Sequence, residues 1–82
     1  MSLSPSAEAL LAHREWVYTL ARSIVGDAHI AEDVAQQTLI TATQNPPRDA
    51  QALPAWLRTV TRNYSFRALR VKAMRQKAER RY

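Results

Sequence analysis

Residues 54–71, PAWLRTVTRNYSFRALRV, decide the fold of this 82-residue chain. The stretch opens on a proline, which suits the first turn of a helix because its fixed φ is helical and its missing N–H is not needed there. Apolar side chains then recur at helical spacing: Trp56, Leu57, Val60, Tyr64, Ala68 and Val71. This pattern predicts a long helix with one apolar face and arginines on the others.

Two shorter helices are predicted upstream of it. The first covers residues 6–25, and Ser4 or Ser6 can cap its start. It ends at Gly26, the one glycine of the chain, which suits a left-handed helix cap. The second begins after Asp27, a good N-cap residue, and carries apolar side chains at helical spacing. It ends near Gln44, because residues 45–47, NPP, cannot continue a helix.

No stretch alternates between apolar and polar residues as a strand does, so the predicted fold class is all-α. We expect a small bundle of three main helices with a basic C-terminal helical extension. One domain spans residues 1–82, with a core at about 6–72 and the extension, or the start of a linker, at 73–82. The connection at residues 45–53 is predicted to be a loop of about ten residues, longer than most helix connections. It is either a functional loop or a plain connector.

Charge is distributed unevenly along the chain. Residues 1–55 carry three arginines and six acidic residues, a sum of −3. Residues 56–82 carry seven arginines and two lysines against one glutamate, a sum of +8. A surface this basic favours a polyanion, most often nucleic acid. The alternative is a solvated tail that only keeps the protein in solution.

Several classes of function are disfavoured by composition. The chain has no cysteine, and His13 and His29 stand too far apart, without other ligands near them, for a zinc site. Glu32 and Asp33 point about 100° apart on a helix, which makes them a poor acid–base pair. We expect no enzyme activity, catalytic residue, metal or cofactor. No apolar run approaches a membrane span and no secretory signal is recognisable, so the expected location is cytoplasmic, without a membrane partner.

Residues 54–75 combine arginines with aromatic and amide side chains, a mixture suited to nucleic acid. Arginine binds phosphates and base edges, an aromatic ring stacks on unpaired bases, and an amide reads an exposed base edge. Four residues at helical spacing are more typical of a core than of a stacking platform: Trp56, Leu57, Val60 and Tyr64. Phe66 falls off this apolar stripe. The candidate DNA-binding residues are Arg58, Arg62, Asn63, Phe66, Arg67, Arg70, Lys72 and Arg75.

A second polar strip lies on the helix predicted over residues 27–44. It contains Glu32, Asp33, Gln36, Gln37 and Ile40. Asp33 lies about one turn before Gln36, and Ile40 lies one turn after it, so these side chains share a face. Such a strip is either solvated surface or a docking face for a basic partner helix.

Two motifs give the chain a resemblance to a known family. Residues 27–39, DAHIAEDVAQQTL, resemble the "gd..dAEDlvQetfl" signature of sigma-70 factors of the extracytoplasmic-function (ECF) type. Residues 55–63, AWLRTVTRN, resemble the "aWLyriarN" segment of that family, and Arg70 matches a basic residue that follows it. The resemblance covers residues 8–75 and corresponds to region 2 of these transcription factors.

The resemblance implies partners and residue roles. The helix with Asp33, Gln36, Gln37 and Ile40 would dock on the clamp helices of the large catalytic subunit of core RNA polymerase. The third helix would melt and read the non-template strand of the promoter −10 element, holding a flipped base with residues 45–53 as a pocket wall. The resemblance gives this role to Arg62, Asn63, Phe66, Arg67 and Arg70. An anti-sigma factor would be a further partner.

The chain departs from the family pattern at three positions. The family often has Glu where this chain has Gln37, often an aromatic near Thr43, and usually Asp where this chain has Arg67. A region 4 helix-turn-helix, normal in such factors, is missing, and we expect an excised domain or a truncated member. Two alternatives therefore stay open. One is a sigma-like module that binds only a polymerase or anti-sigma partner, and the other is a generic basic helical domain that binds nucleic acid.

Overall fold

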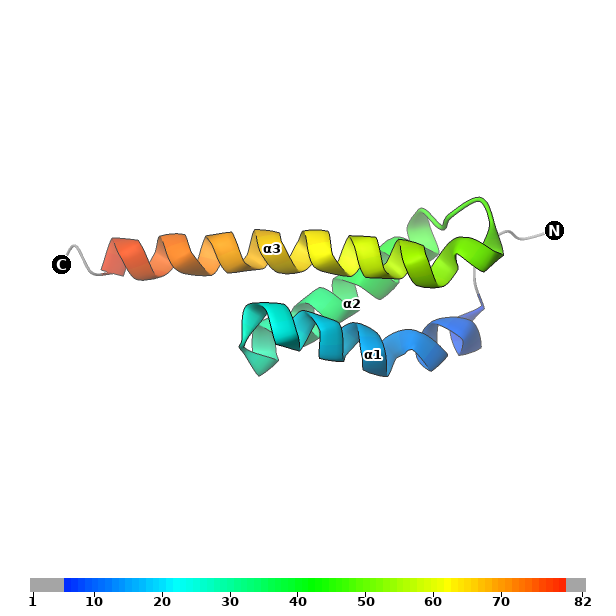
Figure 1. Ribbon diagram of the computed structural model, residues 1–82, viewed down its shortest axis with the longest axis horizontal. Coiled ribbons are helices and arrows are strands. Elements are labelled where there is room, and N and C mark those ends of the chain that lie inside the picture. The colour runs from blue at the N-terminus through cyan, green and yellow to red at the C-terminus, as the bar shows by residue number, and fades with distance from the viewer. Residues whose placement is uncertain (1–5, 80–82) are drawn as a thin grey trace.

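The computed structural model describes residues 6–79, which form three α-helices and one short 3-10 turn (Figure 1). The elements are α1 (Ala7–Val25), α2 (Ala28–Gln44), η1 (Ala50–Ala52) and α3 (Leu53–Glu79). No strand occurs within these residues. The predicted fold class, an all-α bundle of three main helices, is confirmed.

The helix ends follow the predicted capping residues. Ser6 caps α1, its hydroxyl accepting the N–H of Ala9 at 3.1 Å. Gly26 ends the helix with a φ of 70°, a left-handed conformation that costs glycine little because it has no Cβ. Asp27 then caps α2 by accepting the N–H of Ile30 at 3.0 Å. The turn between α1 and α2 is therefore only two residues long.

The connection between α2 and α3 is shorter than predicted. Asp49 accepts the N–H of Gln51 at 2.9 Å and thereby caps η1. The third helix begins at Leu53, one residue before the proline that was expected to open it. Leu53 is only 6% exposed and belongs to the core. The prediction of a loop over residues 45–53 was thus wrong for its last four residues, because packing of Leu53 extends the helical region backwards.

The three helices pack around two groups of buried side chains. The first joins the start of α1, the end of α2 and the start of α3: Leu10, Val17, Ala35, Ala42, Leu53 and Leu57. The second lies farther along, where Tyr64 and Ala68 of α3 pack against Ala21, Val25, Ala31 and Val34. The first group places the end of α2 beside the start of α3, and the second places the start of α2 beside a later part of α3. Consequently, α2 is antiparallel to both other helices, and α1 is parallel to α3.

The buried face of α3 differs from the face that apolar spacing predicts. The fully or almost fully buried positions are Leu53, Leu57, Thr61 and Ser65, four residues apart. The Thr61 hydroxyl donates to the carbonyl of Leu57 at 2.6 Å, so this buried polar group is satisfied within the helix. Val71, predicted on the apolar face, is 47% exposed.

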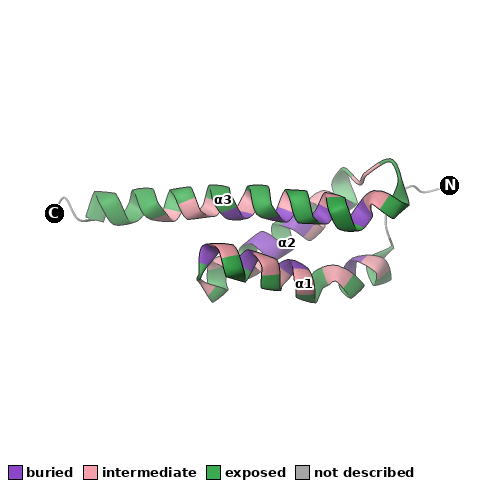
Figure 2. Ribbon diagram, in the orientation of Figure 1, coloured by how far each residue is buried: buried purple, intermediate pink, exposed green. Residues whose placement is uncertain are grey.

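The C-terminal part of α3 extends beyond the other two helices (Figure 2). All residues from 73 to 79 are exposed, and the molecule measures 56 × 19 × 16 Å. The basic extension predicted over residues 73–82 is helical as far as Glu79, and residues 80–82 lie outside the described part. None of the helices within residues 6–79 has the length and apolar character needed to span a membrane.

We predict that Leu57→Ala strongly destabilises the fold. Leu57 is 0% exposed and contacts the core formed by all three helices. Truncating such a side chain costs about 2–5 kcal/mol, a large part of the stability of a domain this small. Urea unfolding followed by circular dichroism measures the loss. The control is Leu11→Ala, because Leu11 is 62% exposed. Equal losses for the two variants would contradict this core.

We also predict that the cap of α2 makes stability depend on pH in the acidic range. The backbone N–H of Ile30 is the main cause that lowers the pKa of the Asp27 carboxyl below its ordinary value. A lowered folded-state pKa stabilises the fold above the unfolded value of about 3.9, and this contribution disappears as the pH falls through the folded value. Thermal unfolding of the wild type and Asp27→Asn from about pH 6 to about pH 2 tests it. Because asparagine caps a helix without titrating, the unfolding temperature of Asp27→Asn should fall less over this range than that of the wild type.

Candidate functional site

The strip predicted on the second helix lies on the exposed surface of α2. Asp33, Gln36, Gln37 and Ile40 are all exposed, and Ile40 is 47% exposed despite its apolar side chain. The neighbouring Glu32 instead points to α1, where it accepts a hydrogen bond from Arg14 at 2.8 Å. Glu32, predicted as part of the strip, is thereby paired with α1, and the strip reduces to the other four residues.

The candidate DNA-binding residues lie along most of α3. Seven of the eight are exposed, and Lys72 is half-buried. Phe66, which falls off the apolar stripe, is 45% exposed. The structure divides these residues into two sets. Arg67, Lys72 and Arg75 line a groove between α3 and α2, whereas the other five do not: Arg58, Arg62, Asn63, Phe66 and Arg70.

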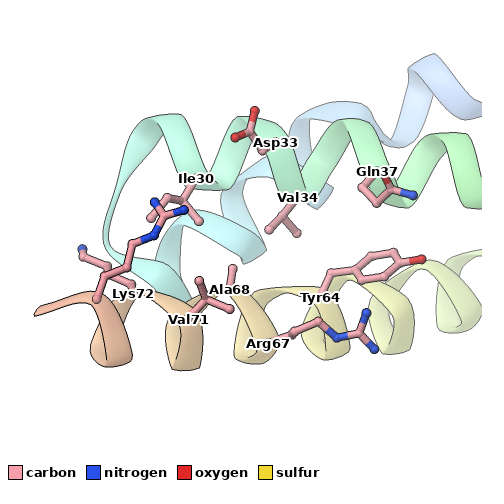
Figure 3. Close-up of a pocket in the computed structure, with 10 residues that line it drawn as sticks. Ile30, Asp33, Val34, Gln37, Tyr64, Arg67, Ala68, Val71 and Lys72 are labelled. Atoms are coloured by element: carbon pink, nitrogen blue, oxygen red, sulfur yellow. The ribbon is translucent and has the colours of Figure 1, made fainter. Parts of the chain in front are cut away.

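The groove between α2 and α3 has a volume of about 580 Å³ (Figure 3). Its apolar lining comes from both helices and comprises Ile30, Val34, Ala68, Val71 and the ring of Tyr64. Asp33 and Gln37 contribute from α2, opposite the cationic residues of α3. The groove therefore brings together residues from both predicted surfaces. Its lining residues from α2 and those from α3 are more than 25 positions apart in the sequence.

Tyr64 connects the two sides of this groove. Its hydroxyl lies 2.8 Å from the hydroxyl oxygen of Thr41 on α2. The Thr41 hydroxyl also donates to the carbonyl of Gln37 at 2.8 Å. Because Thr41 has only one hydroxyl proton, both bonds form together when Tyr64 is the donor. On α3, the guanidinium carbon of Arg67 lies 5.8 Å from the centroid of the Tyr64 ring, within the range of a cation–π interaction.

One cation of α3, Lys72, acts on the start of α2. Bonds from the backbone N–H groups of Ile30 and His29 lower the pKa of the Asp27 carboxyl, and the nearby charge of Lys72 lowers it further. Lys72 lines the same groove as Ile30, which lies three residues after this cap. By contrast, Arg67 forms no ion pair with any residue from 6 to 79.

The two histidines do not lie in the groove. His13 accepts a hydrogen bond at Nδ1 from the indole N–H of Trp16 at 2.9 Å, within the same helix. His29 is exposed. Within the described residues, no three His, Cys, Asp or Glu side chains come close enough to hold a metal ion. The groove brings charged side chains of both helices together with the aromatic ring of Tyr64.

Sequence reasoning missed the contact between Tyr64 and Thr41. It favoured a core position over base stacking for Tyr64 and gave Thr41 no role, yet their hydroxyls form the hydrogen bond between α2 and α3. They are 23 residues apart. The helical spacing of Tyr64 indicated that its ring packs in the core, but no local pattern indicates which residue its hydroxyl contacts.

Comparison with known proteins identifies the family. The family model described as Sigma-70 region 2 matches residues 10–75, which include most of α1, all of α2 and the packed part of α3. No curated protein and no solved structure matches the chain. In sigma factors, region 2 binds core RNA polymerase and recognises the promoter −10 element, and it is a transcription factor domain rather than an enzyme. The chain therefore belongs to the Sigma-70 region 2 family.

Proposed function

We propose that this chain is the region 2 domain of a sigma factor of the ECF type. It docks on the clamp helices of core RNA polymerase through α2 and captures unpaired non-template bases of the −10 element through α3. The observation that carries this proposal is the family match over residues 10–75, which includes both sequence motifs. The charge distribution supports it, because most basic residues of the chain lie on α3, whereas α2 carries Glu32 and Asp33 and no lysine or arginine.

The exposed strip on α2 supports the docking role. Ile40 is a large apolar side chain left 47% exposed at one end of the strip, where a partner could bury it. Asp33 is exposed and forms no ion pair within residues 6–79. A carboxylate, two amides and an isoleucine together suit a partner helix that presents basic and apolar side chains.

The outer face of α3 supports base capture. Asn63 and Phe66 are exposed and lie outside the groove, so they are free to meet an unpaired base. An aromatic ring stacks on any base, and a side-chain amide reads a base edge. Extruding a base from a duplex costs a few kcal/mol, which such contacts offset. The arginines of α3 would bind the adjoining phosphates.

We predict that the double variant Asp33→Ala/Gln36→Ala binds core polymerase, or its isolated clamp-helix fragment, much more weakly than the wild type. Both side chains are exposed, so helicity should not change. Titration at near-physiological salt measures the affinity, and circular dichroism measures the helicity. The matched control is Glu15→Ala/Gln51→Ala, which removes one exposed acid and one exposed amide elsewhere. Wild-type affinity in the first variant would remove the docking surface from α2.

We predict that Asn63→Ala and Lys72→Ala weaken DNA binding in different ways. Single strands selected from a random pool by the wild-type domain are compared with scrambled versions of the same strands. Asn63→Ala should reduce the discrimination between them by about 1–3 kcal/mol, whereas Lys72→Ala should weaken both about equally. Equal losses for both variants on both strands would contradict base reading by Asn63.

The same DNA measurements separate the alternatives. A generic basic domain would show no preference for melted over duplex DNA, and its affinity would fall with salt by about 0.9 log units per phosphate contact on duplex. A module that binds only protein would bind polymerase through α2 and select no strand from the pool. Preference for single strands of one sequence is the result that the proposed function requires.

A further inference from the structure

We infer that Tyr64 is a positioning residue that holds Arg67 ready to bind a backbone phosphate of single-stranded DNA at the edge of the α2–α3 groove. This inference rests on the proposed DNA-binding function. It adds a specific role for two residues that the family match does not distinguish. Four features of the structure carry it: the anchoring of Tyr64, the contact between its ring and Arg67, the free donors of Arg67, and the cations beside it.

The side chain of Tyr64 is held by packing of its ring and by a hydrogen bond of its hydroxyl. The ring packs against the second group of buried side chains, which includes Ala21 of α1 and Val34 of α2. Its hydroxyl donates to Thr41, whose own proton is bound by the carbonyl of Gln37. The side chain therefore loses most of its freedom on folding and offers a rigid aromatic surface on α3.

Arg67 lies over that surface. Its guanidinium carbon is 5.8 Å from the ring centroid, three residues along the same helix. A guanidinium that stacks with its face on a ring leaves its N–H donors at the edge unoccupied. Arg67 is exposed and forms no ion pair with residues 6–79, so these donors are available to an external acceptor.

The neighbours of Arg67 favour a phosphate as this acceptor. Arg67, Lys72 and Arg75 line the same groove, whereas Asn63 and Phe66, which suit base contacts, do not. A planar guanidinium binds a phosphate through two parallel hydrogen bonds, provided that its plane is correctly oriented. Holding Arg67 in one orientation before binding lowers the entropy that binding would otherwise cost.

The two parts of Tyr64 should therefore affect different properties. Tyr64→Phe removes the bond to Thr41 and keeps the ring, so it should lower the unfolding temperature and leave DNA affinity near that of the wild type. Tyr64→Leu also removes the ring, so it should weaken binding of a mixed-sequence single-stranded DNA about two- to fivefold.

Arg67→Ala should weaken binding and also reduce the salt slope by about 0.7, the value expected for one lost phosphate contact on a single strand. Tyr64→Leu should leave that slope unchanged because Arg67 is still present.

A double-mutant cycle gives the decisive test, with all affinities measured by titration of the labelled DNA at a temperature where every variant is folded. Positioning predicts that Tyr64→Leu has no further effect once Arg67 is alanine. In the Arg58→Ala background its two- to fivefold effect should persist, because Arg58 lies outside the groove. If Tyr64 only stabilises the fold, its effect will be the same in all three backgrounds, and that result overturns the inference.

The cycle also distinguishes failure of this inference from failure of the proposed function. Additive effects of Tyr64 and Arg67, with discrimination still lost in Asn63→Ala, would overturn positioning and leave base reading intact. If the wild type binds no single-stranded DNA at all, both fail. In the unbound protein, an upfield NMR shift of the Arg67 side-chain protons should be present in the wild type and Tyr64→Phe, and absent in Tyr64→Leu. An unshifted wild-type signal would also overturn the inference.

Discussion

Burial of Leu57 between all three helices is the contact on which this structure depends. It is the largest side chain that is completely enclosed, and its cluster contains residues from α1, α2 and α3. A chain of 82 residues has few such side chains to bury, so much of its stability depends on a small number of contacts. Leu57 also fixes the rotation of α3. Once it points inward, Asn63 and Phe66 are directed to solvent, and Tyr64 is directed to α2.

Small and polar residues fill the rest of the interface with α3. Thr38, Thr61 and Ser65 are completely buried, and the hydroxyls of Thr38 and Ser65 have no hydrogen-bond partner among residues 6–79. An unpaired buried hydroxyl costs about 1–3 kcal/mol. The small size of these side chains, together with that of Ala31 and Ala35, lets the helices approach closely. The unpaired hydroxyls offset part of the stability that this close packing provides. The burial of Leu57 therefore matters more.

The α2–α3 groove places the two proposed binding surfaces side by side. Asp33 and Gln37, proposed to meet polymerase, line the same groove as Arg67 and Lys72, proposed to meet DNA. Opposite charges across a narrow groove attract one another, and a partner that neutralises one side changes the potential felt on the other. The hydrogen bond between Thr41 and Tyr64 keeps these two sides at a fixed separation. The two proposed binding surfaces therefore lie on one pair of packed helices.

Much of this protein was determined by local sequence. Ser6, Gly26 and Asp27 set helix ends through side-chain oxygens and a left-handed backbone, which act within a few residues. Helical spacing correctly predicted three helices, an exposed Phe66 and a buried Leu57. The charge of the third helix favours a polyanionic partner. The early start of α3 was missed, because burial of Leu53 against other helices decides it.

The site depended more on tertiary structure. The sequence identified exposed candidates on two helices, since exposure follows from periodicity. It could not show that Arg67, Lys72 and Arg75 face α2 while Asn63 faces away, because this depends on the rotation of α3 in the bundle. The contact between Thr41 and Tyr64 joins residues 23 positions apart and exists only when α2 and α3 lie antiparallel. Helix capping and periodicity are local effects, whereas which side chains meet across the groove is decided by packing.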